Sequence, residues 1–194
     1  MSQEYIPWYE LPAKRWKNNP DQLFENDSQR QKLYDAENFA RHQLDKGAFE
    51  FSSIEEVQKF TDKLTSSAWF KRRWGNHKIR VYNETRGTWA RGNSRGFIRL
   101  PFRNDWCHNI IVILHELSHV VRKHDSGGWH GRFFARTLLE LVEHVVGYEA
   151  AKILKESFRR GRVKYLPKRE LSEETREKLR QNFITNVLKQ KVEA

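Results

Sequence analysis

The feature that most constrains this chain is the segment 110–119, where an apolar run leads directly into two histidines four residues apart. Ile110-Ile-Val-Ile-Leu114 precedes His115-Glu116-Leu117-Ser118-His119. Residues i and i+4 of an α-helix lie on one face, so both imidazoles can reach the same ion. The apolar flank predicts that this helix is buried, as a metal site on it requires. We therefore expect the chain to fold around a helix that spans residues 104–123.

The same motif indicates a chemistry. Histidine nitrogens bind zinc at about 2.0–2.1 Å, and His115 and His119 are spaced to do so together. Glu116 adjoins the first ligand, which places its carboxylate beside the metal rather than on it. There it can take a proton from a zinc-bound water, whose pKa the metal lowers toward neutrality. We predict zinc as the cofactor, His115 and His119 as ligands and Glu116 as the catalytic base.

A catalytic zinc site normally has three protein ligands, so one more is expected. His130 follows the turn signal Gly127-Gly128 and begins the next predicted helix, so the chain can fold back and present it. We predict His130 as the third ligand. One alternative is Asp125, which stands at the third-ligand position of extended HExxHxxGxxH sites. The others are two carboxylates of the following helix, Glu140 and Glu143.

The rest of the chain predicts an α+β fold, with a small antiparallel sheet packed on the histidine helix and further helices flanking it. The alternating segment 77–82 and two further short candidates at 88–91 and 97–100, punctuated by glycines, predict three strands in a meander. Apolar periodicity predicts the remaining helices at 28–46, 52–68, 130–146, 148–158 and 172–189. Three parts are expected: an N-terminal arm and helical segment (1–70), a metal-binding core (71–158), and a basic linker with a C-terminal amphipathic helix (159–194).

The chain is basic, with 36 Lys and Arg against 25 Asp and Glu and a net charge of +11. Such an excess attracts polyanions, and the clusters at 71–73 and 159–162 predict weak, salt-sensitive binding to nucleic acid. The first residues lack the pattern of a secretory signal, and the apolar run ending at Leu114 is too short to span a bilayer. We expect a cytoplasmic protein without membrane contact; its oligomeric state is not indicated.

The order of the motifs resembles the SprT-like zinc metallopeptidases, in which a His-Gly-x-x-Phe segment after HExxH supplies the third ligand. Here that segment is Trp129-His130-Gly131-Arg132-Phe133-Phe134. The chain is similar, more closely still, to a family of small metallohydrolases of actinobacteria and their phages. That family has a Leu-Pro step before the HELxH helix, here Leu100-Pro101, and a proline where this chain has Arg132. The resemblance covers residues 77–147 and implies a zincin-like fold.

We therefore predict a zinc-dependent metallohydrolase, foremost a metallopeptidase acting on polypeptides. Strand 96–100 is expected at a sheet edge above the metal, where it can pair with an extended substrate, and Arg95 and Arg99 would favour acidic or unfolded targets. Tyr148 could donate a hydrogen bond to the substrate oxygen, but we predict that its side chain packs in the core instead. The alternatives are a nucleic-acid- or protein-binding module with a structural zinc and a metal-dependent hydrolase of a non-peptide substrate. A fourth protein ligand would favour structural zinc.

Overall fold

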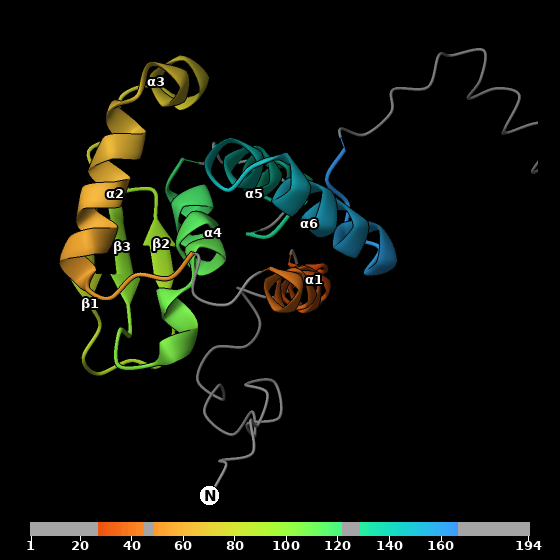
Figure 1. Cartoon of the computed structure of the whole chain (residues 1–194), viewed down its shortest axis with the longest axis horizontal. Helices are drawn as coiled ribbons and strands as arrows, with labels where there is room; N and C mark the ends of the chain where they lie inside the picture. The colour runs from red at the N-terminus through yellow and green to blue at the C-terminus, as the bar shows by residue number, and fades with distance from the viewer. Residues whose placement is uncertain (1–26, 45–48, 122–128, 167–194) are drawn as a thin grey trace, which may run out of the picture.

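The computed structural model describes residues 27–44, 49–121 and 129–166. Over these residues the fold is α+β, as predicted, with six α-helices, a short 3-10 helix and a three-stranded sheet (Figure 1). The α-helices are α1 (Arg30–Gln43), α2 (Ile54–Ser66), α3 (Ala68–Trp74), α4 (Ile110–Val121), α5 (Arg132–Val145) and α6 (Tyr148–Arg160); η2 is Asp105–His108, and the strands are β1 (Arg80–Asn83), β2 (Arg91–Asn93) and β3 (Phe97–Leu100). None of these helices is long and apolar enough to cross a membrane.

Helix α4 lies at the centre of the molecule. Every residue of it is buried except His119, which is partly exposed. The helix begins later than predicted, because η2 occupies the preceding residues and the Asn109 side chain accepts a hydrogen bond from the Ile111 N–H at 2.9 Å. That bond satisfies a backbone donor at the start of the helix, as N-cap residues do. The predicted helix at 172–189 and the N-terminal arm at 1–26 lie outside the described residues.

The sheet differs from the predicted antiparallel meander. Its order is β1-β3-β2, with β1 parallel and β2 antiparallel to β3. The strand predicted to form an edge, β3, is therefore internal, and that prediction is wrong. Alternation of apolar and polar residues determines which face of a strand is buried but not which strands are neighbours. The connection at 84–90 carries the chain past the position that β3 occupies.

One face of the sheet packs on the central helix, and the other faces outward. Val81, Ile98 and Leu100 are buried on the inner side, and β2 and β3 both contact α4. Arg91 and Arg99 are a cross-strand pair on the outer side, where both are exposed. Strand β2 thus forms one edge of the described sheet and lies directly beside α4.

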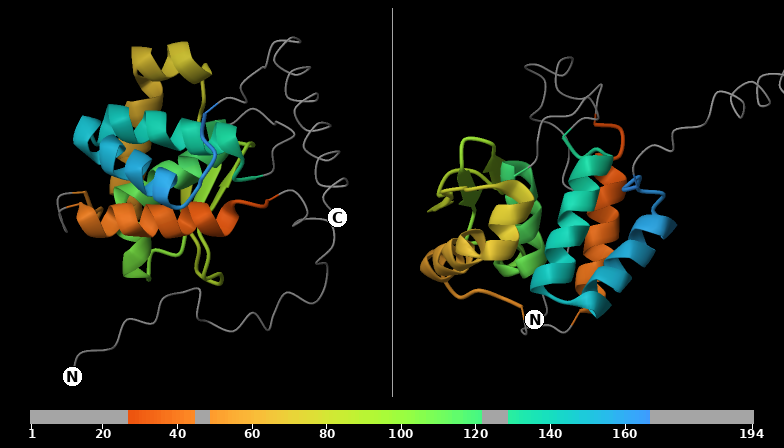
Figure 2. Two further views of the ribbon diagram at one scale, coloured as in Figure 1. Left: turned by 90° about the vertical axis from the view of Figure 1, so that its right-hand side faces the viewer. Right: turned by 90° about the horizontal axis from the view of Figure 1, so that it is seen from above.

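Three helices cover the side of α4 away from the sheet. Helix α5 packs against α4 and α6, and α1 packs against α6 (Figure 2). The inner face of α1 buries Leu33, Ala36, Glu37 and Ala40. A carboxylate in an otherwise apolar stripe needs a partner, because burying an unpaired charge is costly. That partner is His115 of α4.

Candidate metal centre

The structure brings the three predicted histidine ligands together. His115 and His119 leave one face of α4, and His130 stands two residues before α5. The Nε2 atom of His115 lies 3.2 Å from Nε2 of His119 and 3.3 Å from Nε2 of His130. Two nitrogens bound to one tetrahedral zinc are roughly 3.3 Å apart, given bonds of about 2.05 Å. This mostly buried cluster could hold a metal ion.

Two buried carboxylates orient two of the three histidines, His115 and His130. The His115 Nδ1 donates to the Glu37 carboxylate at 2.9 and 3.0 Å, and the His130 Nδ1 donates to Asp27 at 2.7 Å. Asp27 also accepts the backbone N–H of His130 at 2.9 Å. With the hydrogens on Nδ1, both rings direct an Nε2 lone pair into the cluster. One proton could bridge only one of the two short Nε2–Nε2 contacts, whereas one metal ion could bind all three nitrogens.

The protonation of the Asp27–His130 pair suits this arrangement. Burial by itself would raise the pKa of Asp27, but the hydrogen bonds and charge of His130 outweigh it and hold that pKa below its ordinary value. Burial lowers the pKa of His130, and the opposing effect of Asp27 does not cancel it. An ionised Asp27 beside a neutral His130 leaves the Nε2 lone pair available to a metal.

Glu116 points from α4 toward the sheet edge. Its Oε2 accepts the backbone N–H of Gly92 in β2. Burial raises the pKa of Glu116 to about 7, although His115 and the Gly92 hydrogen bond act to lower it. A carboxylate with a pKa near neutrality can accept a proton and release it again at physiological pH, as a general base must.

Gly92 permits this contact because it has no side chain. A Cβ atom at this position would lie 1.9 Å from the Glu116 carbonyl oxygen and 2.7 Å from its carbon. The strand can therefore approach the helix backbone only where the residue is glycine. In the sequence Gly92 looks like one of several glycines between strands, and nothing there indicates its contact with Glu116.

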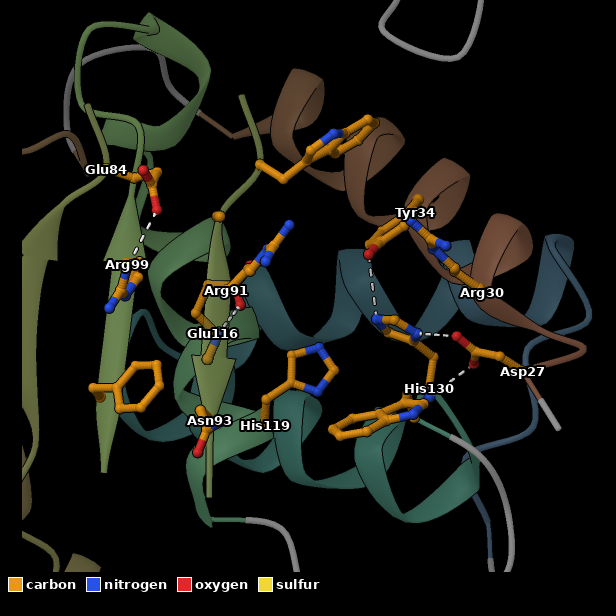
Figure 3. A pocket seen from close by; sticks show the side chains of 15 residues that line it. Asp27, Arg30, Tyr34, Glu84, Arg91, Asn93, Arg99, Glu116, His119 and His130 are labelled. Carbon is orange, nitrogen blue, oxygen red and sulfur yellow. Dashed lines mark hydrogen bonds and ion pairs between the residues drawn. The ribbon is translucent and has the colours of Figure 1, made fainter. Parts of the chain in front are cut away.

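A cleft of about 530 Å³ opens above the three histidines (Figure 3). Glu116, His119 and His130 line its floor, so the cluster is accessible from this side. Its other lining residues come from α1 and the segment before it, from the sheet and its connections, and from the residue preceding His130: Asp27, Arg30, Tyr34, Glu84, Trp89, Ala90, Arg91, Gly92, Asn93, Phe97, Arg99 and Trp129. The cleft thus extends from the histidine cluster to the arginines of β2 and β3, Arg91 and Arg99.

Two of the alternative third ligands, Glu140 and Glu143, do not join the cluster. Glu140 forms ion pairs with Arg73 at 2.7 Å and Arg136 at 2.9 Å, and Glu143 is exposed on α5. Asp125 lies outside the described residues. Within 27–44, 49–121 and 129–166 the cluster contains three potential ligands, all of them histidines. As far as the described residues are concerned, a metal held there would keep a coordination position open toward the cleft.

A tyrosine lies at the site, but it is not the predicted one. Tyr148 is 67% exposed at the start of α6, so the prediction that it packs in the core is wrong. Tyr34 of α1 instead places its hydroxyl 3.3 Å from Nε2 of His130 and stacks on the His115 ring at 5.3 Å. Burial raises the pKa of Tyr34 well above its ordinary value, so the side chain is a neutral phenol.

Besides Gly92, three residues of the site were not predicted from the sequence: Asp27, Tyr34 and Glu37, all from the segment around α1. One signal was available: Glu37 falls in the apolar stripe with Leu33 and Ala40. A charged residue on a buried helix face indicates a buried partner. The sequence does not identify that partner, because His115 is 78 positions away.

Comparisons of the chain with protein-family models, curated proteins and solved structures give no match. What the site does is therefore inferred from its geometry and from the motifs of the chain.

Proposed function

We propose that this chain is a zinc-dependent metallohydrolase of zincin-like fold that cleaves peptide bonds, with Glu116 as its general base. The observation that carries the proposal is the convergence of three histidine Nε2 atoms beside a buried glutamate, at the floor of an accessible cleft. This combination meets the requirements of metal-assisted hydrolysis: ligands, a base and an open side for the substrate.

The donor set favours zinc. Three imidazoles with an open fourth position are typical of catalytic zinc sites, whereas structural sites are closed by four protein ligands. The one cysteine, Cys107, is fully buried. Its thiol hydrogen is shared between hydrogen bonds to the carbonyl oxygens of Pro101 and Asn104. A zinc ion in this cluster would polarise a scissile carbonyl and lower the pKa of a water molecule.

The protein's own groups have separate tasks in this proposal. Glu116 accepts a proton from the attacking water and later passes it to the leaving amine. The Gly92 N–H holds the Glu116 carboxylate at the edge of β2. Asp27 and Glu37 keep the imidazoles of His130 and His115 in the required tautomer and orientation.

Strand β2, rather than β3, is the edge that a polypeptide could approach. In an antiparallel pair, alternate residues bond to the neighbouring strand. The backbone N–H of Gly92 bonds to Glu116, so the backbone groups of Gly92 face away from β3. The backbone groups of Arg91 and Asn93 face β3. The outer edge of this three-residue strand offers little backbone for pairing. Side chains of the cleft must therefore supply much of the binding, and Arg91 and Arg99 favour acidic substrates.

The same short edge supports a second candidate, a metal-dependent hydrolase of a small non-peptide substrate. A cleft of about 530 Å³ has the size of an ordinary small-molecule site. Recognition of such a substrate needs no strand pairing. The two candidates share the metal site and Glu116 and differ in what occupies the cleft.

The proposal is tested with zinc-loaded protein, the chelator-treated protein and the Glu116→Gln variant. Fluorescein-labelled unfolded casein probes peptide cleavage, and a p-nitrophenyl ester probes non-peptide hydrolysis. We expect casein cleavage by the zinc-loaded protein alone, with the Glu116→Gln variant retaining its zinc. Ester hydrolysis without casein cleavage would favour the second candidate. Turnover that is equal in the wild type and in Glu116→Gln would refute the hydrolase proposal altogether.

A further inference from the structure

The hydroxyl of Tyr34 lies beside the histidine cluster, although Tyr34 belongs to α1 and is 96 positions away from His130 in the sequence. Its oxygen is 3.3 Å from Nε2 of His130, and its ring packs against both His115 and His130. Figure 3 shows the hydroxyl pointing at His130, while Glu116 lies beyond His119 on the side of β2. Tyr34 and Glu116 thus approach the cleft floor from different elements, α1 and α4.

The hydrogen-bonding capacity of His130 determines what Tyr34 can do. The Nδ1 hydrogen of His130 is donated to Asp27, so Nε2 is the ring's acceptor and accepts the Tyr34 hydrogen. The same lone pair is the one that binds a metal. Because one lone pair cannot do both, metal binding at Nε2 would release the Tyr34 hydrogen from His130 and make it available to another acceptor.

The surroundings of Tyr34 favour donation into the cleft. The guanidinium carbon of Arg30 lies 5.5 Å from the centre of the Tyr34 ring, and a hydrogen bond from Arg30 also acts on the phenol. Arginine only donates hydrogen bonds, so this contact occupies the phenol oxygen and not its hydrogen. Tyr34, Glu116 and His119 all line the same cleft.

We infer that Tyr34 is a further catalytic residue, whose hydroxyl donates a hydrogen bond to the substrate's carbonyl oxygen as negative charge develops on that oxygen. The inference rests on the proposed function. The phenol keeps its proton, and no covalent bond to Tyr34 forms or breaks. A fixed donor aimed at a developing oxyanion lowers the barrier because it binds the transition state more strongly than the substrate. The helix α1 would then supply a catalytic group as well as the carboxylate that orients His115.

The test compares Tyr34→Phe with the wild type and with Tyr148→Phe, which removes the hydroxyl of an exposed tyrosine on α6. Phenylalanine preserves the packing on His115. Zinc affinity is measured by chelator competition, and kcat and KM are measured with labelled casein. Affinity for a phosphinic dipeptide is measured by calorimetry. The tetrahedral anionic phosphinate imitates the reacting carbonyl.

For Tyr34→Phe we expect zinc affinity and KM within about threefold of the wild type, and about a 100-fold loss in both kcat and phosphinate affinity, the usual effect of removing one such donor. Tyr148→Phe should match the wild type in every measurement. Unchanged kcat and phosphinate affinity would overturn the inference, as would loss of zinc from Tyr34→Phe. If the wild type cleaves casein no faster than Glu116→Gln, the proposed function fails, and phosphinate affinity alone then decides whether Tyr34 is the donor.

Discussion

Because β2 lies so close to α4, we predict that the substitution Gly92→Ala destabilises the fold. The added Cβ would lie 1.9 Å from the Glu116 carbonyl oxygen, whereas real Cβ contacts are essentially never below 3.0 Å. Strand and helix must therefore separate by more than about 1 Å, in an interior that is close-packed. That shift also disrupts the hydrogen bond between the Gly92 N–H and Glu116.

We expect Gly92→Ala to lower the free energy of unfolding by about 3 kcal/mol, the upper part of the usual range for overpacking. For a domain of this size the loss corresponds to a fall in Tm of roughly 6–12 °C. Urea unfolding followed by tryptophan fluorescence, with a chelator present, measures this change without a contribution from bound metal.

Gly87→Ala is the matched control, because its Cβ would meet side-chain atoms of Glu84, the nearest being Cγ at 3.0 Å, rather than backbone atoms. It should cost less than about 1 kcal/mol, since that side chain can move aside. If Gly92→Ala is as stable as the wild type within about 0.5 kcal/mol, β2 does not lie against α4 as described, and the account of Glu116 fails with it.

Three further predictions concern the site and the surface. Glu37→Gln should weaken zinc binding about 10- to 100-fold in chelator competition, because the carboxylate orients and polarises the His115 ring; an effect no larger than that of the exposed control Glu50→Gln would contradict this role. Glu140→Gln should cost about 0.5–1 kcal/mol at pH 7 in urea unfolding. Burial raises the pKa of Glu140, but its two arginine partners lower it overall, so its contribution is complete above the ordinary pKa of 4.5 and is lost as pH falls through the lowered value; a difference from the wild type that persists in acid would refute this assignment. The exposed Lys71 and Arg72 should support weak binding to a single-stranded oligonucleotide, with affinity falling about tenfold or more between roughly 50 and 200 mM salt; in filter binding, an affinity insensitive to salt would exclude counterion release.

The parts of the fold that could be predicted are those set by local pattern. The i, i+4 histidines and the apolar run before them predicted a buried helix with both side chains on one face, and α4 has this form. The Gly127-Gly128 pair in the sequence before His130 predicted that the chain would fold back toward that helix, and Nε2 of His130 lies 3.3 Å from Nε2 of His115. In both cases the structural feature is determined by a few residues that are close together in the sequence.

The parts that could not be predicted depend on contacts distant in the sequence. Strand order is one, because β1, β2 and β3 are only three or four residues long, and periodicity within such short segments does not distinguish a meander from the β1-β3-β2 arrangement. The carboxylate partners are another. Asp27 is 103 positions from His130, and only the packing of the segment around α1 beside α4 and α5 unites them.

The central claim is that His115, His119 and His130 hold one zinc ion and leave a coordination position open. The most direct test is the X-ray absorption spectrum of the zinc-loaded protein. The account predicts one zinc per chain with three imidazole nitrogens at about 2.0–2.1 Å and one further light atom that no protein side chain supplies. A spectrum with fewer than three imidazoles would contradict the ligand assignment. A fourth ligand from the protein would contradict the open, catalytic site.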